Sequence, residues 1–353
     1  FYVPDLLAIG KMYVEKGMID GGGLAKKRVM SYGDYPDDTY TGISDGDYHK
    51  KCIVRSNGVV ENFALGVDKA TFIPLEGKDF MDPQYLSEEV DHSWFTYPDG
   101  TKTLHPIDGV TDPKFTGPKS GTKEKWEYLD EDKKYSWIKS PTFKGKTAEV
   151  GPLAKYIVVY TKVKQGIIKE PTWAEAMIVR QIDTVSQVLG VPAHVWMTTM
   201  VGRTACRGLD AQVAANISQY FFNKLVSNIK NGDTAVADMA KFEPNTWEKD
   251  AKGVGLVDAP RGGLGHWIHI KDGRSANYQC IVPSTWNACP KTAANEHGAY
   301  EDAMIDTHVK IADKPLEILK VIHSFDPCLA CATHLYNKKG EKIVSVNTDA
   351  LCK

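Results

Sequence analysis

Apolar residues recur at helical spacing in two long stretches of the second half of the chain. The first opens with the capping box Thr172-Trp173-Ala174-Glu175 and closes at Gly190. Its apolar stripe consists of Ile178, Ile182, Val185 and Leu189. The second stretch, about 204–231, carries on one face Leu209, Val213, Ile217, Phe221, Leu225 and Ile229. The two stripes predict long helices that pack into a common core.

Shorter patterns predict two further helices. Residues 5–19 end at Gly21-Gly22-Gly23, and their apolar positions are Leu6, Ile9, Tyr13 and Met18. A short helix over 315–322 would lead the chain to its C-terminal cysteines.

Between about residues 42 and 150 the pattern changes to short apolar runs separated by turn residues. Ile53-Val54 and Val59-Val60 flank Asn57-Gly58, a pair that favours the type I′ turn of a hairpin. Pro98-Asp99-Gly100 marks another turn. This region is therefore predicted to be rich in β-hairpins.

One more hairpin is predicted over 267–282, with its turn at Asp272-Gly273. We therefore predict an α+β fold, mainly a bundle of long helices with attached β-hairpins. It would comprise a hairpin-rich region at about 42–150 and a helical core at about 151–334.

Composition narrows the class of protein without identifying it. The 353 residues are 42% hydrophobic and 25% charged, which is typical of a globular chain with a large core. The net charge of −2 gives no reason to expect nucleic acid as a partner. No apolar run is long enough to span a bilayer. Because the first residue is Phe1 rather than methionine, we expect a fragment of a longer protein.

The strongest chemical motif lies near the C-terminal end, in the run Asp326-Pro327-Cys328-Leu329-Ala330-Cys331-Ala332-Thr333-His334. Two cysteines three apart can direct both sulfurs at one metal ion, and His334 adds a further ligand. Pro327 suits the first position of a helix, and the residue before a proline is biased toward an extended conformation. Cys328 would then lie at a helix N-terminus, which favours its thiolate form.

A structural zinc site is the alternative interpretation of this motif. Such a site needs four ligands, usually from two such pairs. The chain has no second C-x-x-C, and its other cysteines are scattered: Cys52, Cys206, Cys280, Cys289 and Cys352. Half of a metal site is therefore present in the sequence.

A second group of unusual residues lies at 258–267, which we predict to be a glycine-rich loop. Pro260 stiffens the position before Arg261, so the guanidinium could be held over a site without flexing. The alternative is a tight loop whose arginine makes a structural salt bridge. Val282-Pro283-Ser284 ends the hairpin that follows and could present a hydroxyl group to the same site.

Together these elements resemble the C-terminal part of the large subunit of nickel–iron hydrogenases of the uptake type. The D-P-C-x-x-C-x-x-H ending, the A-P-R-G-x-L-G-H-W loop and the V-P-S turn occur in the family's order. The resemblance covers residues 1–334 and includes further family-like stretches at 92–94, 135–141, 149–154 and 202–205.

In that family nickel is held by four cysteine thiolates, two of which bridge to an iron that also carries carbon monoxide and two cyanides. The resemblance implies that Cys328 is a terminal nickel ligand and Cys331 a nickel–iron bridge. It also implies that Arg261 hangs over the open side of the metal pair and that Asp326 orients it. Catalytic roles would thus fall to Arg261, Asp326 and Cys328.

The resemblance implies two further binding functions. Pro260 and Arg261, together with Val282, Pro283 and Ser284, would surround the metal ligands, with Ser284 and the backbone near Arg261 donating hydrogen bonds to the cyanides. His334 would bind a magnesium ion, with the backbone carbonyl of Cys280 as another candidate ligand.

Partners and location are implied in the same way. The resemblance implies a small subunit with iron–sulfur clusters as electron acceptor, a maturation endopeptidase, nickel-insertion factors and a membrane cytochrome b. It implies a protein on the periplasmic side of the cytoplasmic membrane, exported with the small subunit after maturation in the cytoplasm.

The chain departs from the family pattern in two ways. The family's R-x-C-G-x-C motif is absent, so two of the four nickel ligands are missing and we expect no activity from the chain alone. Residues 335–353 continue beyond His334, where mature large subunits usually end, and we expect this tail to be removed. A permanent C-terminal hairpin is the alternative. A relative from respiratory complex I is a third class of protein, and Cys328 and Cys331 argue against it.

Overall fold

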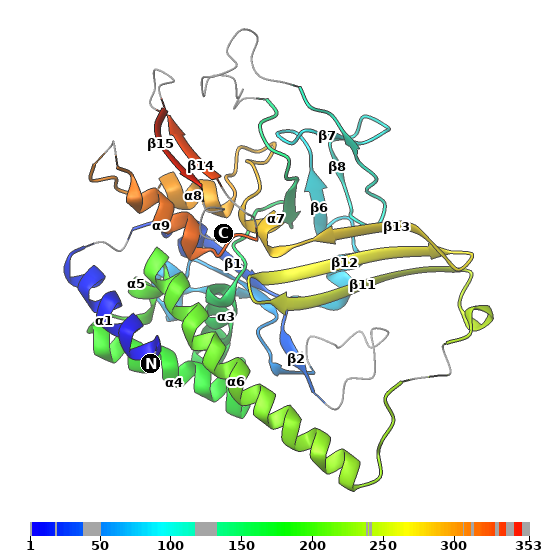
Figure 1. The fold of residues 1–353 in the computed structure, drawn as a ribbon, viewed down its shortest axis with the longest axis horizontal. Helices are drawn as coiled ribbons and strands as arrows, with labels where there is room; N and C mark the ends of the chain where they lie inside the picture. The colour runs from blue at the N-terminus through cyan, green and yellow to red at the C-terminus, as the bar shows by residue number, and fades with distance from the viewer. Residues whose placement is uncertain are drawn as a thin grey trace.

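The computed structural model describes residues 2–17, 20–37, 51–116, 133–237, 239, 242–305, 307–311, 314–328, 332–336 and 342–347, without the side chains of 2, 3, 6, 332–336 and 342–347. Its helices are α1 (Tyr2–Glu15), α2 (Leu24–Lys27), α3 (Pro152–Lys164), α4 (Trp173–Leu189), α5 (Ala193–Met197), α6 (Met200–Lys230), α7 (Pro283–Asn287), α8 (Ala299–Ile305) and α9 (Leu316–Ser324). Short 3₁₀ helices lie at Phe63–Leu65, Val67–Lys69, Gly77–Met81 and Pro244–Thr246. In Figure 1, α1, α4, α5 and α6 gather on one side of the strands.

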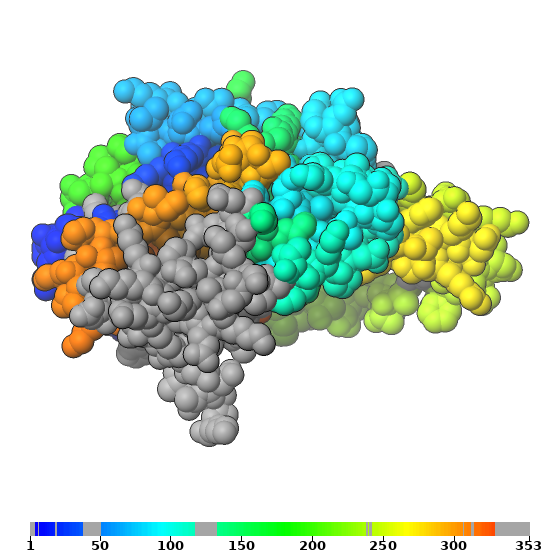
Figure 2. Space-filling model, turned by 90° about the horizontal axis from the view of Figure 1, so that it is seen from above, coloured from blue at the N-terminus to red at the C-terminus, as the bar shows by residue number. Residues whose placement is uncertain are grey.

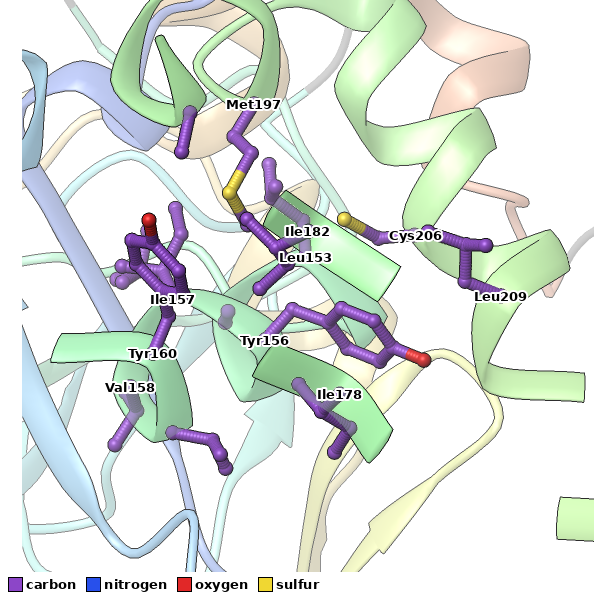
Figure 3. Close-up of a cluster of buried hydrophobic side chains, with 14 of the residues drawn as sticks. Leu153, Tyr156, Ile157, Val158, Tyr160, Ile178, Ile182, Met197, Cys206 and Leu209 are labelled. Atoms are coloured by element: carbon purple, nitrogen blue, oxygen red, sulfur yellow. The ribbon is translucent and has the colours of Figure 1, made fainter. Parts of the chain in front are cut away.

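The main core lies where α3, α4 and α6 pack together (Figure 3). Ile178, Ile182 and Val185 are buried there, as their helical spacing predicts. The predicted stripe on α6 is buried in its first half, but Leu225 and Ile229 are 57% and 53% exposed. The prediction is wrong for these turns because α6 runs on past α3 and α4 (Figure 1).

The ends of α4 match their sequence signals. Thr172 Oγ1 accepts the Glu175 N–H (3.1 Å), and a Glu175 carboxylate oxygen accepts the Thr172 N–H (2.8 Å), which completes the capping box. Gly190 ends the helix in the left-handed conformation. The helices predicted at 5–19, about 204–231 and 315–322 are also present, as α1, α6 and α9.

The strands form several small antiparallel sheets. Their bounds are β1 (Arg28–Ser31), β2 (Asp34–Pro36), β3 (Cys52–Val54), β4 (Gly58–Glu61), β5 (Thr71–Ile73), β6 (Leu86–Glu89), β7 (Phe95–Thr96), β8 (Thr103–Leu104), β9 (Asp112–Pro113), β10 (Ser140–Phe143), β11 (Asp250–Ala259), β12 (Gly262–Lys271), β13 (Arg274–Ile281), β14 (Ala332–Tyr336) and β15 (Lys342–Asn347). The sheet orders are β1-β4-β5, β10-β6-β8, β11-β12-β13, β14-β15, β2-β3 and β7-β9.

The hairpin predicted around Asn57-Gly58 is wrong. β3 pairs with β2, whereas β4 pairs with β1 and β5, so the strands on either side join different sheets. Asn57 is buried, and its side chain donates to the Leu75 carbonyl (3.1 Å) and accepts from Lys162 Nζ (3.1 Å). These distant partners override the local preference for a hairpin turn.

The turn predicted at Pro98-Asp99-Gly100 is present, since the Gly100 N–H donates to the Tyr97 carbonyl (3.0 Å). Its flanking strands do not pair with each other. β7 pairs with β9, and β8 pairs with β6.

Residues 258–267, predicted as a loop, instead form the ends of two long strands. Ala259 pairs with Gly262, so the turn contains Pro260 and Arg261 alone. The predicted hairpin at 267–282 is present as β12 and β13 and becomes a three-stranded sheet with β11. β11 and β12 contain five glycines, which have no side chain and so interrupt the alternation of apolar and polar residues by which a strand is recognised in a sequence.

The sheet β11-β12-β13 is a long ribbon with one inner and one outer end. Figures 1 and 2 show its outer end, where β12 passes into β13, projecting from the body of the molecule. Its inner end, where β11 passes into β12, lies in the middle, near α3 and α7 (Figure 1). The turn that carries Arg261 is therefore surrounded by other elements. Among the described residues, no helix is long and apolar enough to cross a membrane.

Candidate active site

The Pro260-Arg261 turn rests directly on the backbone at the start of α3. A Cβ atom on Gly262 would lie 2.4 Å from the Gly151 amide nitrogen, so no side chain fits there. Gly262 also has a φ of 122°, which L-residues rarely adopt. This close contact fixes where the turn, and with it Arg261, can lie.

Asp326 ends helix α9 and does not precede a new helix. Its N–H donates to the His323 carbonyl (3.0 Å), and its φ of 54° is the left-handed conformation common after a helix C-cap. The extended conformation predicted for Asp326 is therefore wrong. The helix predicted from Pro327 is also wrong, because Pro327 and Cys328 lie in no helix. The conformation that ends α9 outweighs the bias toward an extended conformation that the following proline imposes. Because Cys328 does not lie at a helix N-terminus, a helix dipole does not favour its thiolate form.

Asp326 brings two arginines together. Arg261 Nε donates to its carbonyl oxygen (3.0 Å) and lies 3.3 Å from its Oδ2. Arg207 on α6 donates to the Ser324 carbonyl (2.8 Å), and its Nε lies 3.7 Å from the same Oδ2. The three side chains are 26–41% exposed. Ion pairs of this exposure stabilise a fold by only about 0–1 kcal/mol, so the main effect is on the direction of Arg261.

The two other predicted motifs also meet. The Cys328 N–H donates to Ser284 Oγ (3.3 Å), and Ser284 is buried on the first turn of α7, after Val282 and Pro283. Within the described part of the chain, the Ser284 hydroxyl proton is donated to no acceptor. The Cys328 side chain is exposed. Four sequence-predicted residues, Arg261, Ser284, Asp326 and Cys328, thus form one cluster.

Cys331 lies outside the described residues, as does the side chain of His334. Cys280 lies on β13 opposite His266, and its Sγ is 3.2 Å from His266 Nδ1. Beside it, Gln279 Nε2 donates to the buried carboxylate of Glu88 (3.2 Å), which also accepts from Lys139 Nζ (2.5 Å). The magnesium site suggested for Cys280 and His334 remains a prediction.

A buried ion pair under this cluster had no assigned role in the sequence analysis. Arg203 on α6 donates to both carboxylate oxygens of Glu149 (2.7 and 2.8 Å) and to the carbonyls of residues 21 and 22 (2.6 and 2.7 Å). Its guanidinium carbon lies 3.9 Å from the centroid of the Phe325 ring, next to Asp326. The pair joins segments distant in sequence, so no local pattern could have revealed it.

Asn287 forms a second connection that the sequence analysis missed. Its Nδ2 donates to the Val150 carbonyl (2.8 Å), and its Oδ1 accepts the Val150 N–H (3.0 Å). The helix that carries Ser284 is thereby bound to the segment on which the Arg261 turn rests.

Asp258, near the end of β11, is fully enclosed by other residues. Its pKa is raised to about 6, chiefly by burial and also by the negative charge of Asp34. Lys155 and the hydrogen bonds from Ser31 and the Tyr32 N–H act in the opposite direction. Burial likewise raises the pKa of Asp34. Asp258 can therefore take up a proton near neutral pH, unlike an exposed aspartate.

This raised pKa predicts a pH-dependent stability that Asp258→Asn removes. The folded protein holds the proton more tightly than the unfolded chain, so Asp258 lowers stability as the pH rises from about 4 to about 6. A pKa of about 6 against the ordinary 3.8 corresponds to about 3 kcal/mol. Urea unfolding should show that, between pH 4 and pH 7, the free energy of unfolding of wild type falls by about this much relative to that of the variant. Parallel pH dependences of the two proteins would contradict the assignment.

The described residues would supply part of a nickel–iron centre and not a complete ligand set. They contain no group of three or more His, Cys, Asp or Glu side chains that could hold a metal ion. They do contain an exposed thiol at Cys328, a fixed guanidinium and a hydroxyl donor within one cluster. Soft thiolate donors suit nickel and iron, so these residues fit part of such a site.

Comparison with known proteins shows which family this chain is similar to. The model of a family described as nickel-dependent hydrogenase matches residues 1–334. The uptake hydrogenase large subunit of Rhizobium leguminosarum bv. viciae is 44% identical over 347 residues, covering 98% of this chain and 54% of that protein. The hydrogenase-1 large chain of Escherichia coli (strain K12) is 41% identical over 345 residues, covering 98% and 53%. The chain thus spans about half the length of these relatives.

The fold is also found in solved structures. A reduced, active form of the Ni-Fe-Se hydrogenase from Desulfomicrobium baculatum matches with a TM-score of 0.64 and 23% identity, covering 93% of this chain and 55% of that one. Identity at this level shows the fold alone. The predicted α+β fold, with long helices and attached antiparallel strands, is confirmed.

Proposed function

The chain belongs to the nickel-dependent hydrogenase family, and we propose that it supplies one cysteine pair and the arginine beside it to an uptake hydrogenase large subunit. The complete enzyme would catalyse the reversible heterolytic cleavage of dihydrogen. The observation that most supports this proposal is the meeting of Arg261, Asp326, Cys328 and Ser284, which come from three separate segments.

Cys328 and Cys331 would hold the nickel–iron centre as thiolates, the form in which cysteine binds soft metals. When bound, this centre, with its carbon monoxide and cyanide ligands, would polarise dihydrogen for heterolytic cleavage. Ser284 would donate its hydroxyl proton to a cyanide, since that proton is donated to no acceptor within the described part of the chain. Pro260, Val282 and Pro283 would line the same space. His334 and the Cys280 carbonyl would bind magnesium.

Arg261 would act as a fixed charge and a hydrogen-bond donor. Its Nε is fixed by the carbonyl of Asp326 (3.0 Å), and Asp326 Oδ2 lies 3.3 Å away. In the described part of the chain, the terminal nitrogens of Arg261 donate no hydrogen bond, so they remain available to the reacting molecule. Heterolysis needs a base for the proton, and the Cys328 thiolate would supply it. The charged guanidinium of Arg261 has no lone pair to accept that proton, so it would direct its N–H groups and its charge at the reacting molecule.

Electrons would pass to an iron–sulfur small subunit and then to a membrane cytochrome b. Nickel-insertion factors and an endopeptidase would act during maturation in the cytoplasm. The mature pair of subunits would work on the periplasmic side of the membrane, exported together.

Metal analysis and infrared spectroscopy of the complete protein test this function. Nickel and iron with infrared bands of carbon monoxide and cyanide are expected. Zinc alone, without these bands, would instead support a structural zinc module, the alternative interpretation of the cysteine motif.

The chain alone is expected to oxidise no dihydrogen. Its sequence has one C-x-x-C pair, whereas the proposed centre needs four thiolates. Dihydrogen-driven dye reduction by the purified chain measures this directly. Addition of a separately produced segment carrying R-x-C-G-x-C serves as the positive control. Turnover without that segment would contradict the ligand count.

The tail 335–353 is expected to be cleaved after His334 once nickel is bound. The backbone of β14 pairs with β15, His334 opposite Ser345, so β14 must separate from β15 before a protease can bind it as an extended substrate. The pair Lys339-Gly340 predicts a turn between these two strands, and it lies outside the described residues. Intact-mass analysis should show the shortened form in protein from a nickel-replete host and not in protein from a nickel-depleted host. A fully active subunit that still ends at Lys353 would instead support a permanent hairpin.

A further inference from the structure

Asp258 is a buried carboxylate placed two residues before the Pro260-Arg261 turn. Its side chain accepts hydrogen bonds from residues 31–33, at the end of β1, and from Ser56, which follows β3. The donors are the hydroxyl groups of Ser31 and Ser56 (the latter at 3.2 Å) and the N–H groups of Tyr32 (3.2 Å) and Gly33 (3.3 Å). The strand that enters the turn is thus tied to residues 31–33 by side-chain hydrogen bonds.

The other strand of the ribbon meets the same segment. Gly263 pairs with Asp258 across the ribbon, and a Cβ atom on Gly263 would lie 2.8 Å from the Tyr32 ring. Gly262 meets the backbone of residues 150–151 in the same way. Both strands next to the turn are therefore fixed, one by hydrogen bonds and the other by close packing.

Asp258 interacts with a nearby cation as well as with its hydrogen-bond donors. Lys155 on α3, the nearby cation, donates to Asp34 (2.8 Å) and to Asp210 (3.0 Å). Tyr35 also lies within this buried polar group. Lys155 favours the charged form of Asp258 through its positive charge, whereas the hydroxyl and N–H donors contact the carboxylate directly and so tie its strand to residues 31–33.

We infer that Asp258 is a positioning residue for Arg261, holding the entry strand of the turn so that the guanidinium reaches Asp326. This inference rests on the proposed function of Arg261. Arg261 follows Asp258 by three residues, and its described hydrogen bond is the one to the Asp326 carbonyl. A loosened entry strand would let the guanidinium drift while leaving the cysteines in place.

Asp258→Asn tests the inference in the complete, metal-loaded enzyme. Asparagine keeps the shape but offers one acceptor oxygen to several donors, and its NH₂ group faces other N–H groups. We expect nickel content at the wild-type level and turnover per nickel about tenfold to a hundredfold lower, as for a misplaced catalytic group. Asp79→Asn is the matched control, since Asp79 is a buried aspartate that accepts the Glu76 N–H (3.0 Å) outside this cluster. Its turnover per nickel should be unchanged.

A double-mutant cycle separates positioning from a general effect on stability. In an Arg261→Lys background, Asp258→Asn should lower turnover less than twofold further, because the group that it positions is already gone. A purely structural Asp258 would give the same fold-change in both backgrounds, or would lower yield without changing turnover per nickel. Either result overturns the inference.

Failure of the inference can be told apart from failure of the proposed function. If the unsubstituted protein shows no carbon monoxide or cyanide bands and no nickel, the proposed function is wrong. If those are present and Asp258→Asn turns over at the wild-type rate per nickel, the positioning role alone is wrong.

Discussion

Cys328→Ser is expected to remove nickel from the matured protein and to abolish dihydrogen oxidation. A serine hydroxyl is a hard donor that stays protonated at neutral pH, whereas the thiolate is soft and forms readily. The substitution changes one atom on an exposed side chain, so the fold should persist. Nickel per chain and the infrared bands of carbon monoxide and cyanide measure the loss. Cys331→Ser is expected to have the same effect, since a bridging ligand must bind both metals.

Cys52→Ser provides the matched control for this loss. Cys52 is a buried thiol on β3, and burial raises its pKa to about 12, so it is not a thiolate at neutral pH. Its substitution should lower stability while nickel content stays at the wild-type level. Normal nickel content in Cys328→Ser would exclude Cys328 as a ligand.

Arg261→Lys should leave the metals bound but lower turnover per nickel by about 10²–10⁴, the range for a positioned acid–base group. Lysine retains the charge but lacks the planar guanidinium, whose Nε donates to the Asp326 carbonyl at 3.0 Å. Dihydrogen oxidation normalised to nickel content measures the effect. The normalisation matters because a poorly folded variant also loses activity.

Arg55→Lys serves as the control for replacing an arginine in an ion pair. Arg55 binds both carboxylate oxygens of Glu175 (2.9 and 2.6 Å) at the start of α4. Its replacement should lower stability and leave turnover per nickel unchanged. If Arg261→Lys behaves in the same way, Arg261 is a structural residue, as the alternative interpretation of its turn proposes.

Both substitutions act on one cluster that is supported from below by buried hydrogen bonds. Arg203 joins Glu149 to residues 21–22 and packs on Phe325, just before the cysteine motif. Asn287 joins the Ser284 helix to Val150. Such support keeps a guanidinium and a thiol in one geometry, which reactions that depend on orientation require.

The long helices could be predicted because their signals are local. In α4 the capping box, the apolar stripe and the final Gly190 all lie within 19 residues, and each appears in the structure as expected. The exposed end of α6 shows the limit of this approach. Periodicity tells which face of a helix is apolar, but burial of that face depends on what packs against it.

The hairpins could not be predicted to the same degree, because strand partners lie far apart in sequence. Asn57-Gly58 has a good turn pattern, yet the Asn57 side chain forms hydrogen bonds with Leu75 and Lys162. The strands on either side of this pair join different sheets. Asp326 was expected to be extended because a proline follows it. It is left-handed instead because it ends the helix before it.

The sequence by itself determined the chemistry that this protein can offer: a C-terminal cysteine pair, a stiffened arginine and a nearby hydroxyl, in an order that resembles one family. Residue types and short spacings are properties of the chain, so they need no fold to be read. The tertiary structure decided that Arg261 meets Asp326, that Ser284 meets Cys328, and that Arg203, Asn287 and Asp258 support them. These contacts join residues distant in sequence, and they form because burial leaves each polar group only the partners that packing brings to it.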